Sequence, residues 1–153
     1  MMTPLFKKLN YKAFPEICIL NPPQEMNEEM KEMSKLCYVN TNEVTQGHPI
    51  QFILVFVTKL NEIEQSIQKI FPELHVDALL WYAYPKSTSK KYTCEFNRDN
   101  GFQAIGKYNL EPVRMVAIDE NWSALRFRKV EYIKKFTRHN AMILSEKGKE
   151  RKK

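Results

Sequence analysis

The stretch from Phe52 to Tyr84 decides the fold and reads FILVFVTKLNEIEQSIQKIFPELHVDALLWYAY. Its first six residues are all apolar and rich in β-branched and aromatic types, which is typical of a strand buried on both faces. Residues 60–74 carry apolar side chains at helical spacing, and residues 78–84 predict a second apolar strand. A strand, a helix and a strand connected in this way form a right-handed crossover unit with two parallel strands.

The segments before this unit extend the pattern. Residues 16–20 predict a first strand that Asn21-Pro22-Pro23 ends, because proline has no amide hydrogen. Residues 24–36 carry methionines at helical spacing, and residues 37–39 predict a short strand. Within the central unit, Asn61 and Glu64 have the spacing of a capping box at the start of the helix.

The segments after the unit predict an antiparallel addition. A short helix is expected within residues 97–107, followed by strands at 112–118 and 122–128. The connection between these two strands is so short that they must form a hairpin. The prediction is therefore a single Rossmann-like, three-layer α/β domain over residues 1–144. Its open sheet is mostly parallel with a C-terminal antiparallel hairpin, residues 130–144 close it as a helix, and residues 145–153 form a basic flexible tail.

Composition is that of an ordinary globular protein, with 153 residues of which 43% are hydrophobic and 27% charged. The N-terminus carries no export signal, and the longest apolar run is far shorter than the roughly 20 residues that cross a bilayer. Cys18, Cys37 and Cys94 lack any Cys-x-x-Cys spacing and are interpreted as reduced thiols. We therefore expect a cytoplasmic protein with no membrane partner.

The formal net charge of +6 is partly a property of the C-terminus. Residues 146–153 hold five basic and two acidic side chains, which is half of the excess. A basic segment can bind phosphates, but this one has no aromatic residue on which bases could stack. A solvated tail is the expectation, and nucleic-acid binding through the tail is an alternative.

Candidate ligand-binding residues follow from the predicted sheet, because ligands bind outside the carboxyl ends of parallel strands. Asn21, Lys59, Lys86 and Asp119 lie in the loops at those ends. Arg98, at the start of the third helix, is expected to reach the same ligand as Lys86. The lysines favour an anionic ligand; the alternatives are solvated lysines and, for Arg98, a surface ion pair.

The strand over residues 122–128 adds three more candidates. Side chains alternate along a strand, so Trp122, Arg126 and Arg128 share one face. Arginine forks match carboxylate and phosphate, so this face is a second place for an anionic or planar ligand. The alternative is that both arginines pair with acidic residues of the closing helix on an edge strand.

Several common chemistries lack their signatures. None of the four glycines follows the first strand, so dinucleotide binding through Gly-x-Gly-x-x-Gly is not expected. His48, His75 and His139 are scattered without metal-ligand spacing. Asn21-Pro22-Pro23 is similar to the Asn/Asp-Pro-Pro-aromatic motif of amino-methyltransferases, but no aromatic follows, and we interpret it as a strand terminator. No cofactor, metal or catalytic residue is predicted.

Two resemblances concern larger parts of the chain. The segments Leu80–Lys86, with its Tyr-Pro-Lys, and Trp122–Arg128, reading Trp-Ser-Ala-Leu-Arg-Phe-Arg, resemble a family of small uncharacterised bacterial proteins known as a domain of unknown function. That likeness implies a family and no activity.

The predicted topology also resembles the second half of class I methyltransferases, which use S-adenosylmethionine. Those enzymes have a glycine-rich loop after the first strand, and this chain lacks such a loop. They also have an acidic residue at the end of the second strand, and Glu43 is the candidate for that residue here.

Three functions are therefore open. The leading expectation is a non-catalytic or regulatory binding domain whose crevice, near Lys86, Arg98 and Arg126, takes a small anion or an acidic protein surface. The first alternative is a minimal or degenerate S-adenosylmethionine-dependent methyltransferase-like enzyme. The second is weak nucleic-acid binding through the basic tail.

Overall fold

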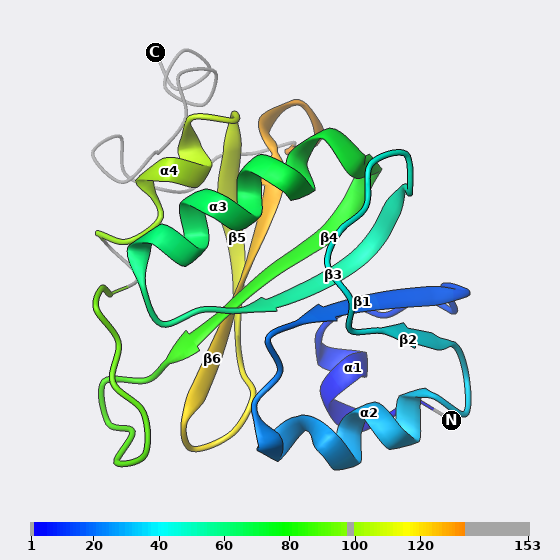
Figure 1. The fold of residues 1–153 in the computed structure, drawn as a ribbon, viewed down its shortest axis with the longest axis horizontal. Coiled ribbons are helices and arrows are strands. Elements are labelled where there is room, and N and C mark those ends of the chain that lie inside the picture. Colours follow the sequence, from blue (N-terminus) through cyan, green and yellow to red (C-terminus); the bar gives the residue numbers. More distant parts are fainter. Residues whose placement is uncertain (1, 98–99, 134–153) are drawn as a thin grey trace.

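The computed structural model describes residues 2–97 and 100–133, and six strands of this part form one sheet (Figure 1). Their order is β2-β1-β3-β4-β6-β5. The first four are parallel, and β6 runs antiparallel to both of its neighbours. This confirms the predicted Rossmann-like, mostly parallel sheet with an antiparallel hairpin. The strands are β1 (Glu16–Leu20), β2 (Tyr38–Asn40), β3 (Ile50–Phe56), β4 (Leu74–Pro85), β5 (Leu110–Ala117) and β6 (Trp122–Lys129).

Helices cover both faces of the sheet. One face packs against α1 (Pro4–Lys8), α2 (Asn27–Met33) and the 3₁₀ turn Gln24–Met26 before it. The other packs against α3 (Leu60–Ile70) and α4 (Gln103–Gly106). Because side chains alternate, β3 sends Phe52, Leu54 and Phe56 to the first face and Ile53 and Val55 to the second. This explains why its sequence is apolar without interruption.

Helix α1 was not expected from the sequence. Thr3 caps it by accepting a hydrogen bond from the Phe6 amide at 3.2 Å. Phe6 and Leu9 are completely buried, and the Trp81 indole donates to the Leu9 carbonyl at 3.0 Å. The five-residue helix is too short to show a periodic stripe, although its side chains belong to the core.

The helix boundaries correct two predictions. The capping box is not formed by Asn61 and Glu64; instead the Glu62 carboxylate accepts from the Thr58 and Lys59 amides, at 2.8 and 3.0 Å. The reason is that the helix already begins at Leu60, so Glu62 occupies its first turn. The methionine-rich helix ends at Met33 rather than at residue 36, beyond which the chain turns towards β2.

The sequence suggested that the last strand lies at the edge of the sheet. In the structure β6 instead lies between β4 and β5. Leu125 of β6 pairs with Tyr82 of β4 on one side and with Met115 of β5 on the other. The carboxylate of Asp119 forms the hairpin turn by accepting from the Asn121 and Trp122 amides, both at 2.8 Å. After β6 the chain forms a 3₁₀ turn at Val130–Tyr132. The rest of the predicted closing helix and the basic tail lie outside the described residues.

Two further features concern the length of the helices and the state of the cysteines. No helix within residues 2–97 and 100–133 is long and apolar enough to cross a membrane. The three cysteines form no disulfide, and burial raises the pKa of the Cys18 thiol to about 11. That thiol is therefore protonated and unreactive at neutral pH.

Candidate functional site

The strand order reverses direction at β1, because β2 lies on one side of it and β3 on the other. In open α/β sheets ligands bind at this point, outside the carboxyl ends of the strands. In Figure 1 the loops that follow β1, β3 and β4 lie together at the left. Asn21 directly follows β1 in the left-handed backbone conformation, with φ of 54°, which asparagine tolerates better than most residues. Pro22 and Pro23 come next and supply no amide donors.

A cavity of about 260 Å³ lies at this reversal point. Its wall combines the end of β1, the loop after β2 and one side of α3. Glu43, from the loop, is exposed, and its carboxylate is an acceptor for hydroxyl or amino groups. The Ser66 hydroxyl is 2.6 Å from the Tyr82 hydroxyl and donates to the Ile63 carbonyl. The polar residues lining the cavity are Asn21, Thr41, Glu43, Glu62, Gln65, Ser66 and Lys69.

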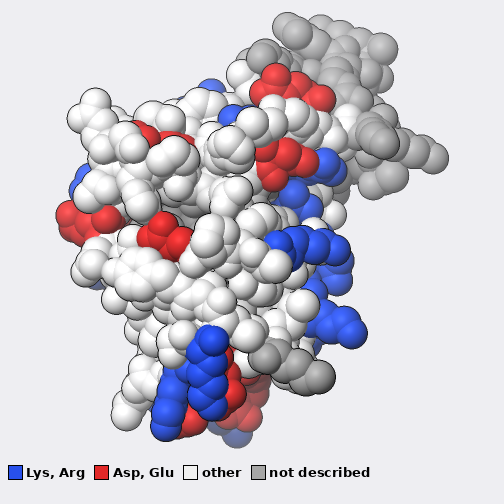
Figure 2. Space-filling view, turned by 90° about the vertical axis from the view of Figure 1, so that its right-hand side faces the viewer, with Lys and Arg blue, Asp and Glu red and all other residues white. Residues whose placement is uncertain are grey.

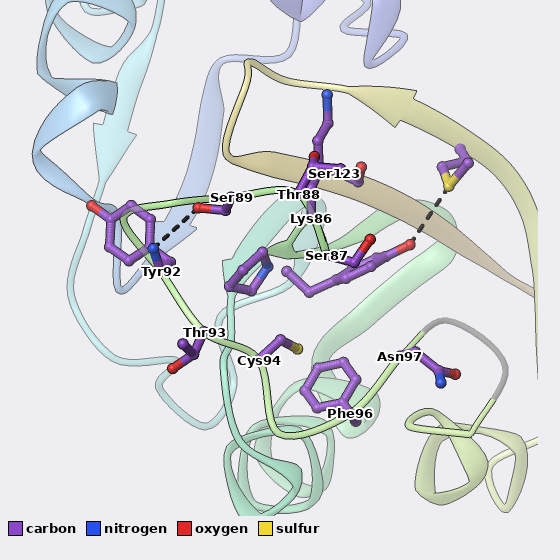
Figure 3. A pocket seen from close by; sticks show the side chains of 13 residues that line it. Lys86, Ser87, Thr88, Ser89, Tyr92, Thr93, Cys94, Phe96, Asn97 and Ser123 are labelled. Carbon is purple, nitrogen blue, oxygen red and sulfur yellow. Dashed lines mark hydrogen bonds between the residues drawn. The ribbon is translucent and has the colours of Figure 1, made fainter.

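A larger cavity of about 810 Å³ lies at the carboxyl end of β4 (Figure 3). Tyr84 and Phe96 contribute aromatic rings 6.1 Å apart, and the Tyr84 hydroxyl donates to the Met115 sulfur at 3.5 Å. The Phe96 ring packs directly on Gly101, where a side chain would collide with it. The remaining residues that line it are Pro85, Lys86, Ser87, Thr88, Ser89, Tyr92, Thr93, Cys94, Asn97 and Ser123.

Glu25 connects the loop after β1 to the loop after β4. Its carboxylate is 2.5 Å from the Lys91 ammonium group and accepts from the Tyr92 hydroxyl at 2.8 Å and from the Trp122 indole at 3.4 Å. The Tyr92 and Trp122 rings are 4.8 Å apart. The hydrogen bond from Lys91, aided by those from Tyr92 and Trp122, lowers the pKa of Glu25 against the effect of burial. This cluster fixes one side of the larger cavity.

The lowered pKa of Glu25 predicts a pH dependence of stability. A carboxyl group with a depressed pKa in the folded state stabilises the protein above its unfolded value of about 4.3. That contribution is lost as the pH falls through the folded value. We expect Glu25→Gln to lower the melting temperature at pH 7, and to lower it by less as the pH falls towards 3. Thermal denaturation followed by circular dichroism from pH 3 to 7 measures this, and an equal effect at both pH values would contradict it.

Five of the predicted site residues lie at the carboxyl edge of the parallel strands, with different surroundings. Asn21 lines the smaller cavity and Lys86 the larger one. Lys59 precedes α3 and is exposed. The Asp119 carboxylate accepts a hydrogen bond within the hairpin turn. Trp122 is buried against Phe56, with ring centroids 5.0 Å apart. Their roles in ligand binding stay predictions.

Arg126 and Arg128 lie elsewhere. Because β6 runs antiparallel, it starts at the carboxyl edge with Trp122 and carries the arginines towards the opposite edge. Arg128 makes a two-point contact with Asp77 of β4, at 3.0 and 2.6 Å, and Arg126 lies 4.0 Å from the same carboxylate. Burial and the neighbouring Arg128 lower the pKa of Arg126. Within the described residues the arginines therefore pair with Asp77 of β4, while the closing helix that the sequence suggested as their partner lies outside those residues.

The expected meeting of Lys86, Arg98 and Arg126 is thus wrong for Arg126, and Arg98 lies outside the described residues. Figure 2 faces the side on which β1 and β3 begin, and shows Lys and Arg along one margin and again at the lower end, where Asp or Glu lie beside them. Sequence reasoning also missed Glu25, whose partners lie 66 to 97 positions away along the chain. No local pattern indicates such contacts.

Comparison with known proteins finds likeness in structure alone. No family model matches the chain, and no curated protein matches it. A S-adenosylmethionine-dependent methyltransferase from Aquifex aeolicus shares 11% identity and a TM-score of 0.50, over 84% of this chain and 91% of that one. LepI, solved in complex with S-adenosylmethionine, shares 12% identity and a TM-score of 0.50 over 83% of this chain, which spans about half (47%) of LepI. The N-methyltransferase NodS from Bradyrhizobium japonicum has a TM-score of 0.49 at 11% identity, over 74% of this chain and 73% of NodS.

These likenesses correct the leading functional expectation. At 11 to 12% identity they show the fold, which this chain shares with a solved methyltransferase and with LepI. The expectation of a non-catalytic domain for a small anion or an acidic surface is contradicted by these likenesses. The structure also argues against the anion site, because the two arginines that were predicted to bind the anion pair with Asp77, away from the carboxyl edge of the sheet. The resemblance to the bacterial family of unknown function stays a prediction.

Proposed function

We propose that the chain is a minimal S-adenosylmethionine-dependent methyltransferase-like enzyme that binds this cofactor at the reversal point between β1 and β3. The observation that carries the proposal is the position of the 260 Å³ cavity at the strand reversal, with Glu43 and Asn21 in its wall. Such crevices are where open α/β sheets bind nucleotide-like ligands. The fold shared with a solved S-adenosylmethionine-dependent methyltransferase, and with LepI solved in complex with S-adenosylmethionine, supports the same assignment.

The donor set fits the nucleoside part of the cofactor. A carboxylate such as that of Glu43 accepts hydrogen bonds from the paired hydroxyls of a ribose. Gln65, on the exposed side of α3, and Asn21 offer amide groups that both donate and accept, as an adenine edge requires. Pro22 and Pro23 fit less well, because they remove amide donors that a glycine-rich loop would provide. In this respect the site is reduced compared with class I methyltransferases.

The cofactor supplies an electrophilic methyl group when bound. The protein's own contribution is then to hold the acceptor in line with that group and to exclude water, which converts an encounter between two molecules into a single oriented step. The residues placed for this are those of the loops after β3 and β4, which lie beside the reversal point (Figure 1). A cytoplasmic location is part of this proposal, because Cys18, Cys37 and Cys94 form no disulfide.

Titration calorimetry with S-adenosylmethionine and with S-adenosylhomocysteine tests the proposal. We expect saturable binding of both to the unmodified protein. Glu43→Gln is expected to weaken binding about 10- to 100-fold, the usual loss for a hydrogen bond to a charged group. The matched control is Glu120→Gln, an exposed carboxylate in the hairpin turn, which should bind like the unmodified protein. Absence of heat with both compounds at millimolar concentration refutes the proposal.

A further inference from the structure

Among the residues that the structure describes, those lining the larger cavity at the end of β4 carry almost no charge. No aspartate or glutamate is among its lining residues, and Lys86 is its one cationic residue within the described chain. In Figure 3 the Lys86 side chain extends away from Cys94, Phe96 and Asn97. A charged ligand placed there would lose its hydration without gaining a partner of opposite sign. The cavity therefore suits an uncharged molecule.

Aromatic rings form one wall of this cavity and are held in place. Tyr84 packs against Phe96 and Phe102, with ring centroids 6.1 and 5.7 Å away, and these two rings are 5.3 Å apart. Phe96 is buried, and its position is fixed further by Gly101 beneath it. Rings that are already immobilised bind a flat apolar surface with little loss of side-chain entropy. A planar ring is the shape that such a wall accommodates.

Hydroxyl groups line the rest of the cavity. The Ser89 hydroxyl is already used, because it donates to Asn121 at 2.8 Å and accepts from the Tyr92 amide at 3.0 Å. In contrast, the side-chain hydroxyls of Ser87, Thr88, Thr93 and Ser123 have no hydrogen-bond partner among the described residues. Each hydroxyl both donates and accepts, so together they match a ligand with polar substituents.

From these three features we infer that the 810 Å³ cavity binds the methyl acceptor, and that the acceptor is an uncharged aromatic molecule with hydroxyl substituents. The volume lies within the range of about 300–1,000 Å³ that is usual for small-molecule sites. The inference rests on the proposed function for the role of the bound molecule. The chemical class of that molecule rests on the cavity itself.

Three probes of similar size separate the features of this class. Resorcinol is flat, uncharged at pH 7 and carries two hydroxyls; 3-hydroxybenzoate adds a negative charge, and 1,3-cyclohexanediol removes the flat ring. Titration followed by amide chemical shifts in NMR, without cofactor, measures binding and locates it. We expect resorcinol to bind, with shifts at Phe96 and Ser123, and each other probe to bind at least about 10-fold more weakly. Equal binding of either other probe overturns the assigned class.

A matched pair of serine variants tests the location. Ser123→Ala removes one hydroxyl from the cavity and is expected to weaken resorcinol binding about 2- to 10-fold. Ser34→Ala removes an exposed hydroxyl at the end of α2 and should leave binding unchanged. Thermal denaturation of both variants shows whether either has lost its fold. An unchanged affinity for a folded Ser123→Ala contradicts the site.

The two proposals fail in distinguishable ways. If S-adenosylmethionine binds and resorcinol does not, the acceptor class is wrong and the proposed function stands. If resorcinol binds and S-adenosylmethionine does not, the cavity takes the assigned class of molecule but its role as an acceptor site is refuted.

Discussion

Replacing Phe6 by alanine is expected to lower the free energy of unfolding by about 3–5 kcal/mol, as is usual for a buried phenylalanine. The Phe6 side chain is completely buried, and its ring lies 5.7 Å from that of Phe52 in the central strand β3. Alanine leaves a cavity between α1 and the sheet that the surrounding side chains fill only partly. Urea denaturation followed by circular dichroism measures the change.

The control for this substitution is Tyr38→Ala, which removes a large side chain that is 59% exposed on the edge strand β2. A change within about 0.5 kcal/mol is expected there, as for most surface positions. If Phe6→Ala costs no more than Tyr38→Ala, α1 is not part of the core. In that case the contact between the Trp81 indole and the Leu9 carbonyl would not be formed in solution.

The sequence predicts β3, β4 and α3, but it predicts neither α1 nor the position of β6 in the sheet. Continuous apolar runs identify β3 and β4, since only strands covered on both faces need them. Helix α3 is visible from its stripe of Ile63, Ile67 and Ile70, all buried. Helix α1 has no comparable stripe, and the insertion of β6 between β4 and β5 depends on pairing between distant segments. Such pairing leaves no local pattern in the chain.

The residues of the candidate site are likewise predicted only in part from the sequence. The rule that ligands bind at the carboxyl ends of strands leads from sequence to Asn21 and Lys86, which line the two cavities. The rule places loops and does not orient side chains, so it does not reveal that Lys86 extends away from Cys94 and Phe96 (Figure 3). The position of Arg126 was missed because the direction of β6 carries it to the opposite edge. The expectation that Lys86 and Arg126 meet in one crevice therefore fails for Arg126.

The second large effect is expected at Asp77, the carboxylate that holds both of these arginines. Arg126 is 14% exposed, and its Nε atom has no hydrogen-bond partner within the described residues. Arg114 of β5 is paired with Arg126 across the strands and adds a further positive charge. Asp77→Ala thus removes the carboxylate that both Arg126 and Arg128 contact, and leaves these guanidinium groups close together. Breaking a fully buried pair costs about 3–5 kcal/mol, and partial exposure reduces the expected loss here to about 2–3 kcal/mol.

Urea denaturation of Asp77→Ala, compared with Glu32→Ala, checks this estimate. Glu32 pairs with Lys35 at 3.2 Å on the surface of the helical segment, where such a pair contributes less than about 1 kcal/mol. Adding Arg126→Leu to Asp77→Ala should restore part of the stability, because it removes one of the unpaired charges together with its desolvation. Equal losses for Asp77→Ala and Glu32→Ala, or a further loss in the double variant, would contradict the role of Asp77. The repulsion among the arginines would then be relieved by solvent rather than by this carboxylate.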